Sequence, residues 1–388
     1  MHEIYDILIV GAGPAGALTG SLLSKAGYKV LILDGAKEVK RKVCGEYLCP
    51  LGVDLVKQLD LEHLIQDFHQ INGMNIFSPR GQIVRSLFPD TNKKNYGISL
   101  NRQVFDQRII DMAIENGATL INDSAVAKFE YQGSYWSVSC VNQRKYNGRL
   151  LIGADGRRSL IAKTIGASKK SNNQKRVAIH CWLKRKFDFE RVGQMHLFKD
   201  SSYIGIDPIS NDELNVSLVC DAKVIKEFGG PLAVLNHYIE KSKFLHQSIG
   251  HVREGERIFT VSPITHELDK YQISNLVLVG DAAGFIDPLT GEGIFNALWM
   301  AKALSCEIIE RKLLLNFNSA IRAYNIKKNS FFRQKKVTNF FFQWLIRKYI
   351  LVEIVAKFLK TNRKRADSFV GIIGNVYSPL KGLIKMVF

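Results

Sequence analysis

Cysteine is scarce in this chain, and its few cysteines form no framework. Only six occur among the 388 residues, and they are scattered. A disulfide-stabilised secreted domain needs paired cysteines at short spacings, so the sequence favours free thiols in a reducing cytoplasm. Cys44 and Cys49 have four residues between them and no nearby histidine, which argues against a metal site. A redox pair of these two thiols is the less favoured alternative.

Long uninterrupted apolar runs are also missing. The first apolar run is only as long as a strand and has no basic start, so we expect no secretory signal peptide. Charges interrupt the apolar stretch 340–359 too often for a transmembrane helix. No internal repeat is present, and the length predicts two or three domains with ample room for a core.

Acidic residues are few, and the charge is uneven. The chain has a net charge of +18, and residues 321–388 hold fifteen Lys and Arg against Glu353 and Asp367, or +13 of that total. Basic residues can bind nucleic acid, but no recognition motif accompanies them, so we expect no nucleic-acid partner.

The basic tail, 326–388, is also rich in apolar residues and is expected to be helical. One helical face can hold Phe341, Leu345, Val352, Val355 and Leu359. Two interpretations stay open: the helices cap the substrate domain with a solvated basic face, or they lie on an anionic membrane surface, the inner face of the membrane. Both can hold if the helices wall an apolar pocket that opens toward the bilayer.

A glycine-rich turn follows the first strand. The apolar run 6–10 leads into Gly-Ala-Gly-Pro-Ala-Gly at 11–16, and a helix follows. Glycines at these spacings permit the tight turn, the approach of a pyrophosphate and close helix–strand packing. Asp34 ends the next strand, where a carboxylate can accept hydrogen bonds from ribose hydroxyls. The sequence therefore predicts a dinucleotide site formed by Gly11, Gly13, Pro14, Ala15, Gly16 and Asp34.

A second glycine-rich turn lies near the other end of the chain. The apolar run 275–279 predicts a buried strand, Asp281 follows it, and the helix predicted at 295–304 comes after the turn. Ligands of open α/β sheets bind at such strand ends, and a helix start offers free N–H groups. A purely structural turn is the alternative. We expect ligand contacts from Asp281, Gly291, Gly293 and Ile294.

These motifs resemble the FAD-dependent oxidoreductases with the p-hydroxybenzoate hydroxylase fold. Residues 150–159 resemble that family's G-A-D-G-x-x-S fingerprint, and residues 99–109 its R-x-x-F/L-D helix. The resemblance implies an α/β fold: a Rossmann-like, glutathione-reductase-like FAD-binding domain, an inserted antiparallel β-sheet substrate domain and C-terminal helices. It also implies FAD contacts from Arg102, Val126, Asp155 and Gly156.

One branch of the family fits better than the others. Residues 41–50 resemble the K-x-C-G-E/G-x-L segment of the geranylgeranyl reductase-like branch, which implies that Cys44, Gly45 and Glu46 lie beside the flavin. The isoprenoid reductases also carry a Tyr–Trp–Phe–Pro patch, and the corresponding segment, Tyr203 to Pro208, has no Trp. This departure weakens the case for geranylgeranyl groups as substrates. The tryptophan-rich motif of flavin halogenases is not visible.

The resemblance predicts a discontinuous domain order. The FAD-binding domain comprises 1–72, 97–175 and 271–325, the substrate domain 73–96 and 176–270, and the C-terminal region 326–388. The polar stretch 169–176 is the expected crossing between domains. Hairpins are expected at 71–85 and at 125–139.

Two enzymatic functions remain open. The first is an FAD-dependent oxidoreductase acting on an apolar, lipid-like substrate of the isoprenoid or polyketide type. The second is an FAD-dependent monooxygenase that hydroxylates an aromatic or polyketide substrate with NAD(P)H and oxygen. No second G-x-G-x-x-G is present, so NAD(P)H is expected only as a transient donor, with ferredoxin or a quinol as the alternative. The catalytic acid or base is not identified; Tyr203, His180 and His196 can face the cavity.

Overall fold

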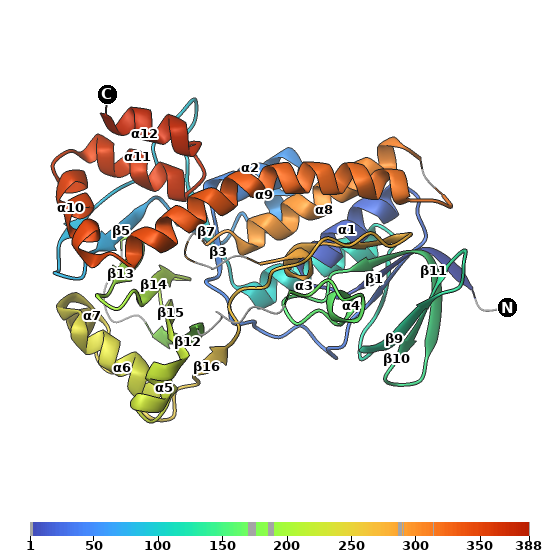
Figure 1. Ribbon diagram of the computed structural model, residues 1–388, viewed down its shortest axis with the longest axis horizontal. Coiled ribbons are helices and arrows are strands. Elements are labelled where there is room, and N and C mark those ends of the chain that lie inside the picture. Colours follow the sequence, from blue (N-terminus) through green and yellow to red (C-terminus); the bar gives the residue numbers. More distant parts are fainter. Residues whose placement is uncertain are drawn as a thin grey trace.

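The computed structural model describes residues 3–169, 176–184, 190–285, 289, 291–312 and 314–387. Residues 170–175 of the predicted domain crossing (169–176) lie outside the described residues, and so do residues 286–288 and 290 of the second glycine-rich turn. Figure 1 shows two β-sheet regions, with the long helix α9 running from one toward the other and the C-terminal helices beyond it.

The first sheet is mainly parallel. Its order is β8-β2-β1-β11-β10-β9, and β17 also pairs with β11. The long strand β11 pairs with the antiparallel strand β10 through its first half and with the parallel strand β17 through its second half. The strands are β1 (Ile4–Val10), β2 (Val30–Leu33), β8 (Thr119–Ile121), β9 (Val126–Tyr131), β10 (Trp136–Cys140), β11 (Lys145–Gly153) and β17 (Leu276–Leu278).

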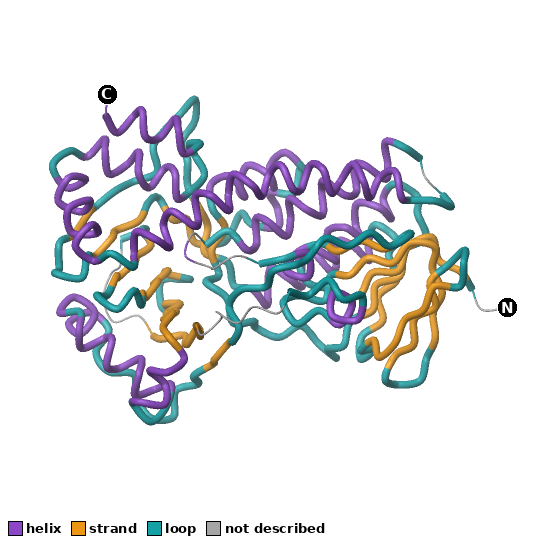
Figure 2. The backbone as a smooth tube through the Cα atoms, in the orientation of Figure 1, coloured by secondary structure: helices purple, strands orange, loops and turns teal. Residues whose placement is uncertain are grey.

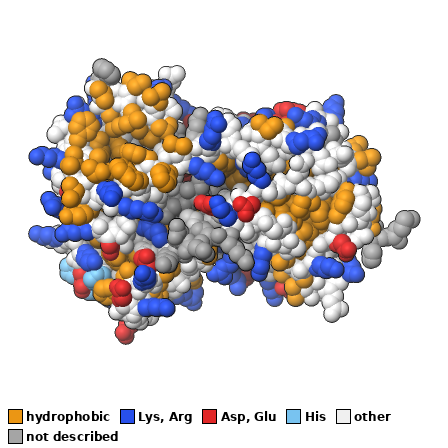
Figure 3. Space-filling model, viewed as in Figure 1, with side chains coloured by type: hydrophobic (Ala, Val, Ile, Leu, Met, Phe, Trp, Pro, Cys, Tyr) orange, Lys and Arg blue, Asp and Glu red, His pale blue; other side chains and the backbone are white. Residues whose placement is uncertain are grey.

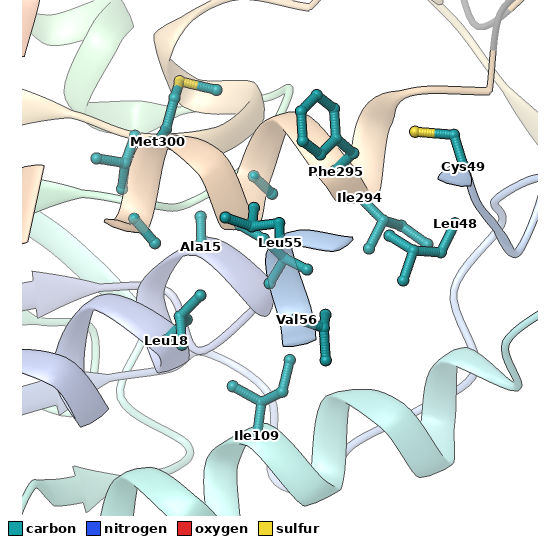
Figure 4. Packing of buried hydrophobic residues seen from close by; sticks show 14 of the residues in the cluster. Ala15, Leu18, Leu48, Cys49, Leu55, Val56, Ile109, Ile294, Phe295 and Met300 are labelled. Atoms are coloured by element: carbon teal, nitrogen blue, oxygen red, sulfur yellow. The ribbon is translucent and has the colours of Figure 1, made fainter. Parts of the chain in front are cut away.

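Burial on both faces explains why the parallel strands are continuously apolar. Ile7 and Ile9 belong to the core beneath the helices, while Leu8 and Val10 pack on the opposite side with Trp136 of β10. Figure 4 shows the helical side of this core, where apolar side chains from four helices and β3 meet. These helices are α1 (Pro14–Lys25), α2 (Pro50–Gln58), α3 (Arg102–Glu115) and α8 (Gly293–Glu310). Helix α4 (Leu160–Thr164) lies on the opposite side of the sheet.

The second sheet has the order β16-β12-β15-β14-β13-β5-β6. All neighbours are antiparallel except β13 and β5. Ile204 and Ile206 of β14 pack in a separate core with α6, so the alternate residues of that strand point to the other face. The strands are β5 (Met74–Phe77), β6 (Ile83–Val84), β12 (Arg176–Lys184), β13 (Gly193–Leu197), β14 (Tyr203–Pro208), β15 (Glu213–Asp221) and β16 (Phe259–Val261).

Short elements complete this part of the chain. A small antiparallel sheet joins β3 (Tyr47–Leu48), β7 (Gly97–Ser99) and β4 (His69–Ile71). Helices α5 (Ala222–Glu227), α6 (Pro231–Lys241) and α7 (Lys243–Ser248) follow β15. The 3-10 turns η1 (Glu62–Leu64) and η2 (Gly280–Ala283) lie elsewhere in the described residues.

The C-terminal region is helical, as expected, but the helix predicted across 340–359 is not continuous. Figure 2 shows successive helices that fold back beside the second sheet. The chain turns at Arg347 and Lys348, so Phe341 and Leu345 belong to one helix and Val352, Val355 and Leu359 to the next. The helices are α9 (Asn318–Ile346), α10 (Tyr349–Lys360), α11 (Arg363–Ile373) and α12 (Pro379–Val387).

The structure confirms the α/β fold class with a second sheet and C-terminal helices. Both predicted hairpins are also confirmed: β5 pairs with β6, and β9 with β10. The strands that lie in 73–96 and 176–270 form the second sheet. The division into separate domains stays a prediction.

Candidate active site

A cavity of about 680 Å³ lies between the first and second sheets. It brings together all but two of the residues predicted to bind the cofactor. Gly16 and Glu46 are the two that do not line it. The predicted residues that line it are Gly11, Gly13, Pro14, Ala15, Asp34, Cys44, Gly45, Arg102, Val126, Asp155, Gly156, Asp281, Gly291, Gly293 and Ile294.

The first glycine-rich turn forms one end of the cavity. Its glycines differ in whether a side chain at that position would meet the protein or the open cavity. Gly11 has a φ of +103°, and a Cβ there would lie 2.4 Å from the carbonyl oxygen of Ala154. A Cβ on Gly16 would lie 1.9 Å from the Gly11 oxygen, so this glycine allows the helix to pack on the turn. A Cβ on Gly13 would meet only the Lys42 Nζ, at 3.9 Å. The space in front of Gly13 is therefore open to a ligand.

Asp34 stands beside this turn, directly after β2. Its Oδ2 accepts a hydrogen bond from the Ala12 amide at 2.7 Å, and its Oδ1 accepts one from the Ala36 amide at 2.8 Å. These two bonds fix the carboxylate, and each oxygen keeps a further acceptor position. Asp34 can therefore accept hydrogen bonds from ligand hydroxyls, and Val126 lines the same end of the cavity.

Asp155 accepts hydrogen bonds from the first residues of α4 with one carboxyl oxygen and keeps the other oxygen free. Its Oδ2 accepts hydrogen bonds from the Leu160 and Ile161 amides at 2.7 and 3.3 Å. Its Oδ1 is buried and has no partner among the residues that the structure describes. Burial raises the pKa of Asp155. An unpaired buried acceptor beside a cavity indicates a place for a ligand donor.

Cations gather on the same cavity wall. Arg102 is buried and forms two hydrogen bonds with Asp106, at 2.7 and 2.8 Å. Although burial opposes its charge, Asp106 raises the pKa of Arg102. Lys42 lies 3.6 Å from the same carboxylate, and Arg157 Nε lies 3.7 Å from Asp281 Oδ2. Basic side chains in this arrangement suit a diphosphate.

Lys42 and Arg157 were not among the predicted site residues. Each lies within a motif that the sequence analysis singled out, yet the family pattern assigned them no role. Their cavity position follows from the fold, which brings residues 42 and 157 next to the first glycine-rich turn. Their positive charge inside motifs 41–50 and 150–159 was the one feature of the sequence that could have identified them as site residues.

Glu46 lies beneath the cavity and is fully engaged by protein groups. It has a left-handed φ of +52° and is buried. Its carboxylate pairs with the Arg41 guanidinium and accepts hydrogen bonds from Trp182 Nε1 at 2.7 Å and Asn215 Nδ2 at 3.1 Å. These contacts tie the 41–46 loop to the second sheet. Direct contact between Glu46 and FAD stays a prediction.

The start of α8 forms the opposite wall. Gly291 has a φ of +66°, and a Cβ there would lie 2.8 Å from Tyr47 Cδ1. Among the described residues no side chain caps the helix, which begins at Gly293, so its first N–H groups are available to a ligand. Glu292 pairs with Lys335 of α9 and Asn375, which connects this wall to the C-terminal helices.

The second sheet supplies the cavity floor. Tyr203, Gly205 and Asp207 alternate along β14 and line the cavity. His180 and His196, which were expected to be able to face it, are buried and do not line it. Burial lowers the pKa of each imidazole to about 3, so both are neutral near pH 7.

A smaller cavity of about 70 Å³ adjoins this floor. Met74, Met195 and Leu289 line both cavities, so the two meet at these side chains. The smaller one is lined almost wholly by apolar side chains from the second sheet and from α9, α10 and α11. They include Ile76, Val84, Leu197, Phe342, Leu345, Val352, Val355, Ala356, Leu359 and Phe369.

Three curated relatives are similar over most of this chain. Conditioned medium factor receptor 1 of Dictyostelium discoideum is 29% identical over 80% of this chain, which spans 64% of that protein. Digeranylgeranylglycerophospholipid reductase of Methanosarcina acetivorans is 26% identical, with 77% and 73% of the two chains covered. Menaquinone reductase of Mycobacterium tuberculosis is 26% identical, with 80% and 78% covered.

The fold is shared with a solved flavoprotein. The flavoprotein/dehydrogenase of Cytophaga hutchinsonii superposes with a TM-score of 0.80, with 99% of this chain and 96% of that chain covered. Its sequence identity is 20%, so this likeness establishes the fold alone.

The cavity fits FAD. The glycine turn is open at Gly13, Asp34 can take ribose hydroxyls, and Lys42 and Arg157 lie where a diphosphate would pass. A family model described as an FAD binding domain matches residues 4–310. The chain therefore belongs to the FAD binding domain family and is an FAD-dependent oxidoreductase or monooxygenase.

Proposed function

We propose that this protein is an FAD-dependent oxidoreductase, geranylgeranyl reductase-like, that acts on an apolar, lipid-like substrate of the isoprenoid or polyketide type. The apolar continuation of the large cavity carries the proposal. The large cavity includes glycines and charged side chains in a mostly apolar lining, and beyond Met74 and Met195 the lining is almost wholly aliphatic and aromatic. Such a lining favours an apolar chain over a charged substrate.

The names of two relatives support this substrate class. The archaeal and mycobacterial relatives are named as reductases of a digeranylgeranylglycerophospholipid and of menaquinone. This chain covers 73% and 78% of their lengths.

The residues of this chain would bind FAD, orient the substrate against it and shield both from water. FAD supplies the electron chemistry when it is bound. The nucleotide part of FAD would be held by Gly13, Asp34 and Asp155 and by the basic side chains of Lys42 and Arg157. The start of α8 would stabilise negative charge on the flavin ring. Glu46, through Arg41 and Trp182, holds the loop that closes the cavity against the second sheet.

We also propose that the C-terminal helices lie on an anionic membrane surface. Apolar side chains gather over α10 and α12 with basic side chains around them (Figure 3). The exposed apolar set is Phe340, Phe341, Trp344, Ile350, Leu351, Ile354, Phe358, Leu380, Leu383, Ile384 and Val387. The tail's excess of basic residues complements anionic lipid, and each contributes about 1 kcal/mol near such a surface.

Membrane contact of this kind is peripheral. No helix in the described part of the chain is long and apolar enough to cross a bilayer. The apolar face of α10 that lines the small cavity lies opposite its exposed apolar face, so α10 would stand between the cavity and the lipid.

Product mass tests the proposed reaction. The FAD-loaded protein is incubated with a geranylgeranyl lipid or a prenylated quinone and an electron source, with and without oxygen. The proposal predicts a product that gains hydrogen without gaining oxygen, and that forms anaerobically. A product that gains an oxygen atom, formed only aerobically and driven by NADPH or NADH, would establish the monooxygenase function instead.

A further inference from the structure

Asp207 places an unpaired carboxyl in the cavity floor. It lines the large cavity from β14, on the same face as Tyr203 and Gly205. Among the residues that the structure describes, only burial and the charge of Glu46 act on its partly buried carboxyl, and no hydrogen bond does. A carboxyl group without a protein partner is costly unless a ligand or water satisfies it.

The neighbouring strands leave room for this carboxyl and do not bind it. A Cβ on Gly193 of β13 would lie 2.7 Å from Asp207 Oδ1, so glycine creates the space. Asn215 lies directly across from Asp207 on β15. Its amide already donates to the Cys44 carbonyl at 2.8 Å and to Glu46, and its oxygen accepts from Ser217 at 3.1 Å.

The surroundings of Asp207 disfavour its negative charge. Burial raises the pKa of Asp207 to about 7, and the charge of Glu46 adds to the rise. Tyr47 is the other titratable group whose pKa the charge of Asp207 affects. Its pKa is raised mainly by burial, so the Tyr47 hydroxyl is neutral. A protonated carboxyl can donate a hydrogen bond as well as accept one.

We infer that Asp207 recognises an oxygen atom at the reacting end of the substrate, a carbonyl of quinone or enone type that accepts a hydrogen bond from its carboxyl group. This inference rests on the proposed function, because it assumes that the large cavity holds both FAD and substrate. The carbonyl end would lie between β14 and the start of α8, both of which line the cavity. The first carbons of an apolar tail would then lie at Met74 and Met195, next to the small cavity.

Recognition by a neutral acid makes the affinity depend on pH. The test measures calorimetric binding of menadione, a naphthoquinone without a tail, to the FAD-loaded oxidised protein between about pH 5.5 and pH 8.5. Methylnaphthalene, which lacks the two carbonyls, is the matched control ligand. We expect menadione affinity to fall about tenfold across this range as the donor is lost, and methylnaphthalene affinity to stay constant.

Variants separate recognition from folding. In Asp207→Asn the amide donates at every pH, so menadione affinity is expected to become independent of pH. In Asp207→Leu it is expected to be weak at every pH, while methylnaphthalene binding is retained. Asp212→Asn, an exposed residue in the adjacent turn, should behave as the wild type.

Each contrary outcome overturns a different claim. Menadione binding that is independent of pH in the wild type, or a pH dependence that survives in Asp207→Asn, would refute the role of Asp207 and leave the proposed function intact. If the FAD-loaded wild type binds neither ligand at any pH, the proposed apolar substrate site is wrong, and the inference fails with it.

Discussion

Arg41 and Glu46 form a two-bond ion pair that holds the cavity loop in place. Arg41 Nε and Nη2 lie 2.9 and 2.8 Å from Glu46 Oε1 and Oε2, and a further nitrogen of Arg41 lies 2.9 Å from Glu213 on the second sheet. The guanidinium also stacks over Trp182, 4.2 Å from the ring centroid. One buried carboxylate thus links the loop, α3 and the second sheet.

Removing that carboxylate should destabilise the protein strongly. Glu46→Ala leaves Arg41, Trp182 and Asn215 without their shared acceptor, so we expect a loss of about 3–5 kcal/mol in the free energy of unfolding. Denaturant unfolding measures it. Glu213→Gln removes the half-exposed partner of the same arginine and should lose less than about 1 kcal/mol. Equal losses would contradict the central role of Glu46.

Two glycines of the first turn should respond differently to alanine. Gly13→Ala adds a Cβ that meets only the Lys42 amine, in a backbone with φ −69°, so folding should be unchanged. FAD affinity should fall about tenfold or more, because the methyl occupies the ligand space. Gly16→Ala places a Cβ against the Gly11 oxygen and should unfold the turn itself. Fluorescence titration with FAD and circular dichroism measure the two effects.

Filling the small cavity should select against long substrates. Ala356→Leu projects into it from α10, at an overpacking cost of about 1–3 kcal/mol. We expect weaker binding of prenylated ligands and unchanged binding of tail-free analogues, measured by calorimetry. Ile354→Leu, on the exposed face of the same helix, is the control. Unchanged affinity for long-tailed ligands in Ala356→Leu would place the tail elsewhere.

Asp207 should lower stability at alkaline pH. Its pKa of about 7 in the folded protein exceeds the ordinary value of 3.8, so the folded state binds the extra proton between these values. Stability is then lost as pH rises from about 4 to 7. Asp207→Asn should therefore be more stable than the wild type at pH 8, by roughly 1–3 kcal/mol, with no gain near pH 4. Thermal melts at both pH values check the sign, and a gain confined to pH 4 would refute it.

Membrane contact should depend on the outer face of α10. Replacing Ile350, Ile354 and Phe358 by serine removes exposed apolar groups without touching the cavity side. Co-sedimentation with anionic liposomes at low salt should retain the wild type and lose this triple variant. Val141→Ser, an exposed apolar residue at the end of the first sheet, should still sediment. Failure of the wild type to sediment would refute the membrane proposal.

Local motifs made much of the nucleotide end predictable. Gly11, Gly16 and Asp34 are constrained by neighbours within or next to one strand–turn–helix unit, so spacing alone identifies them. The structure places Gly11 and Asp34 at the cavity and Gly16 behind the turn. Their contacts with FAD stay predictions.

Long-range packing was less accessible to sequence reasoning. The partners of Glu46 come from residues 182 and 215, on strands far along the chain. The free carboxyl of Asp207 could not be predicted from sequence. It depends on Gly193 of a neighbouring strand, which leaves space for the carboxyl, and on Asn215, whose amide donates to the Cys44 carbonyl instead. The break at Arg347 was missed because the apolar pattern continues across it, while the next helix turns back over the second sheet.

Anaerobic re-oxidation of the bound flavin tests the central claim most directly. The FAD-loaded protein is reduced with dithionite, freed of excess reductant, and mixed without oxygen with a prenylated quinone or a geranylgeranyl lipid while the flavin absorption band is followed. The account predicts that the band returns with one of these apolar acceptors, and more slowly in Ala356→Leu. A flavin that stays reduced with every apolar acceptor, and is re-oxidised only when oxygen is admitted, would contradict it.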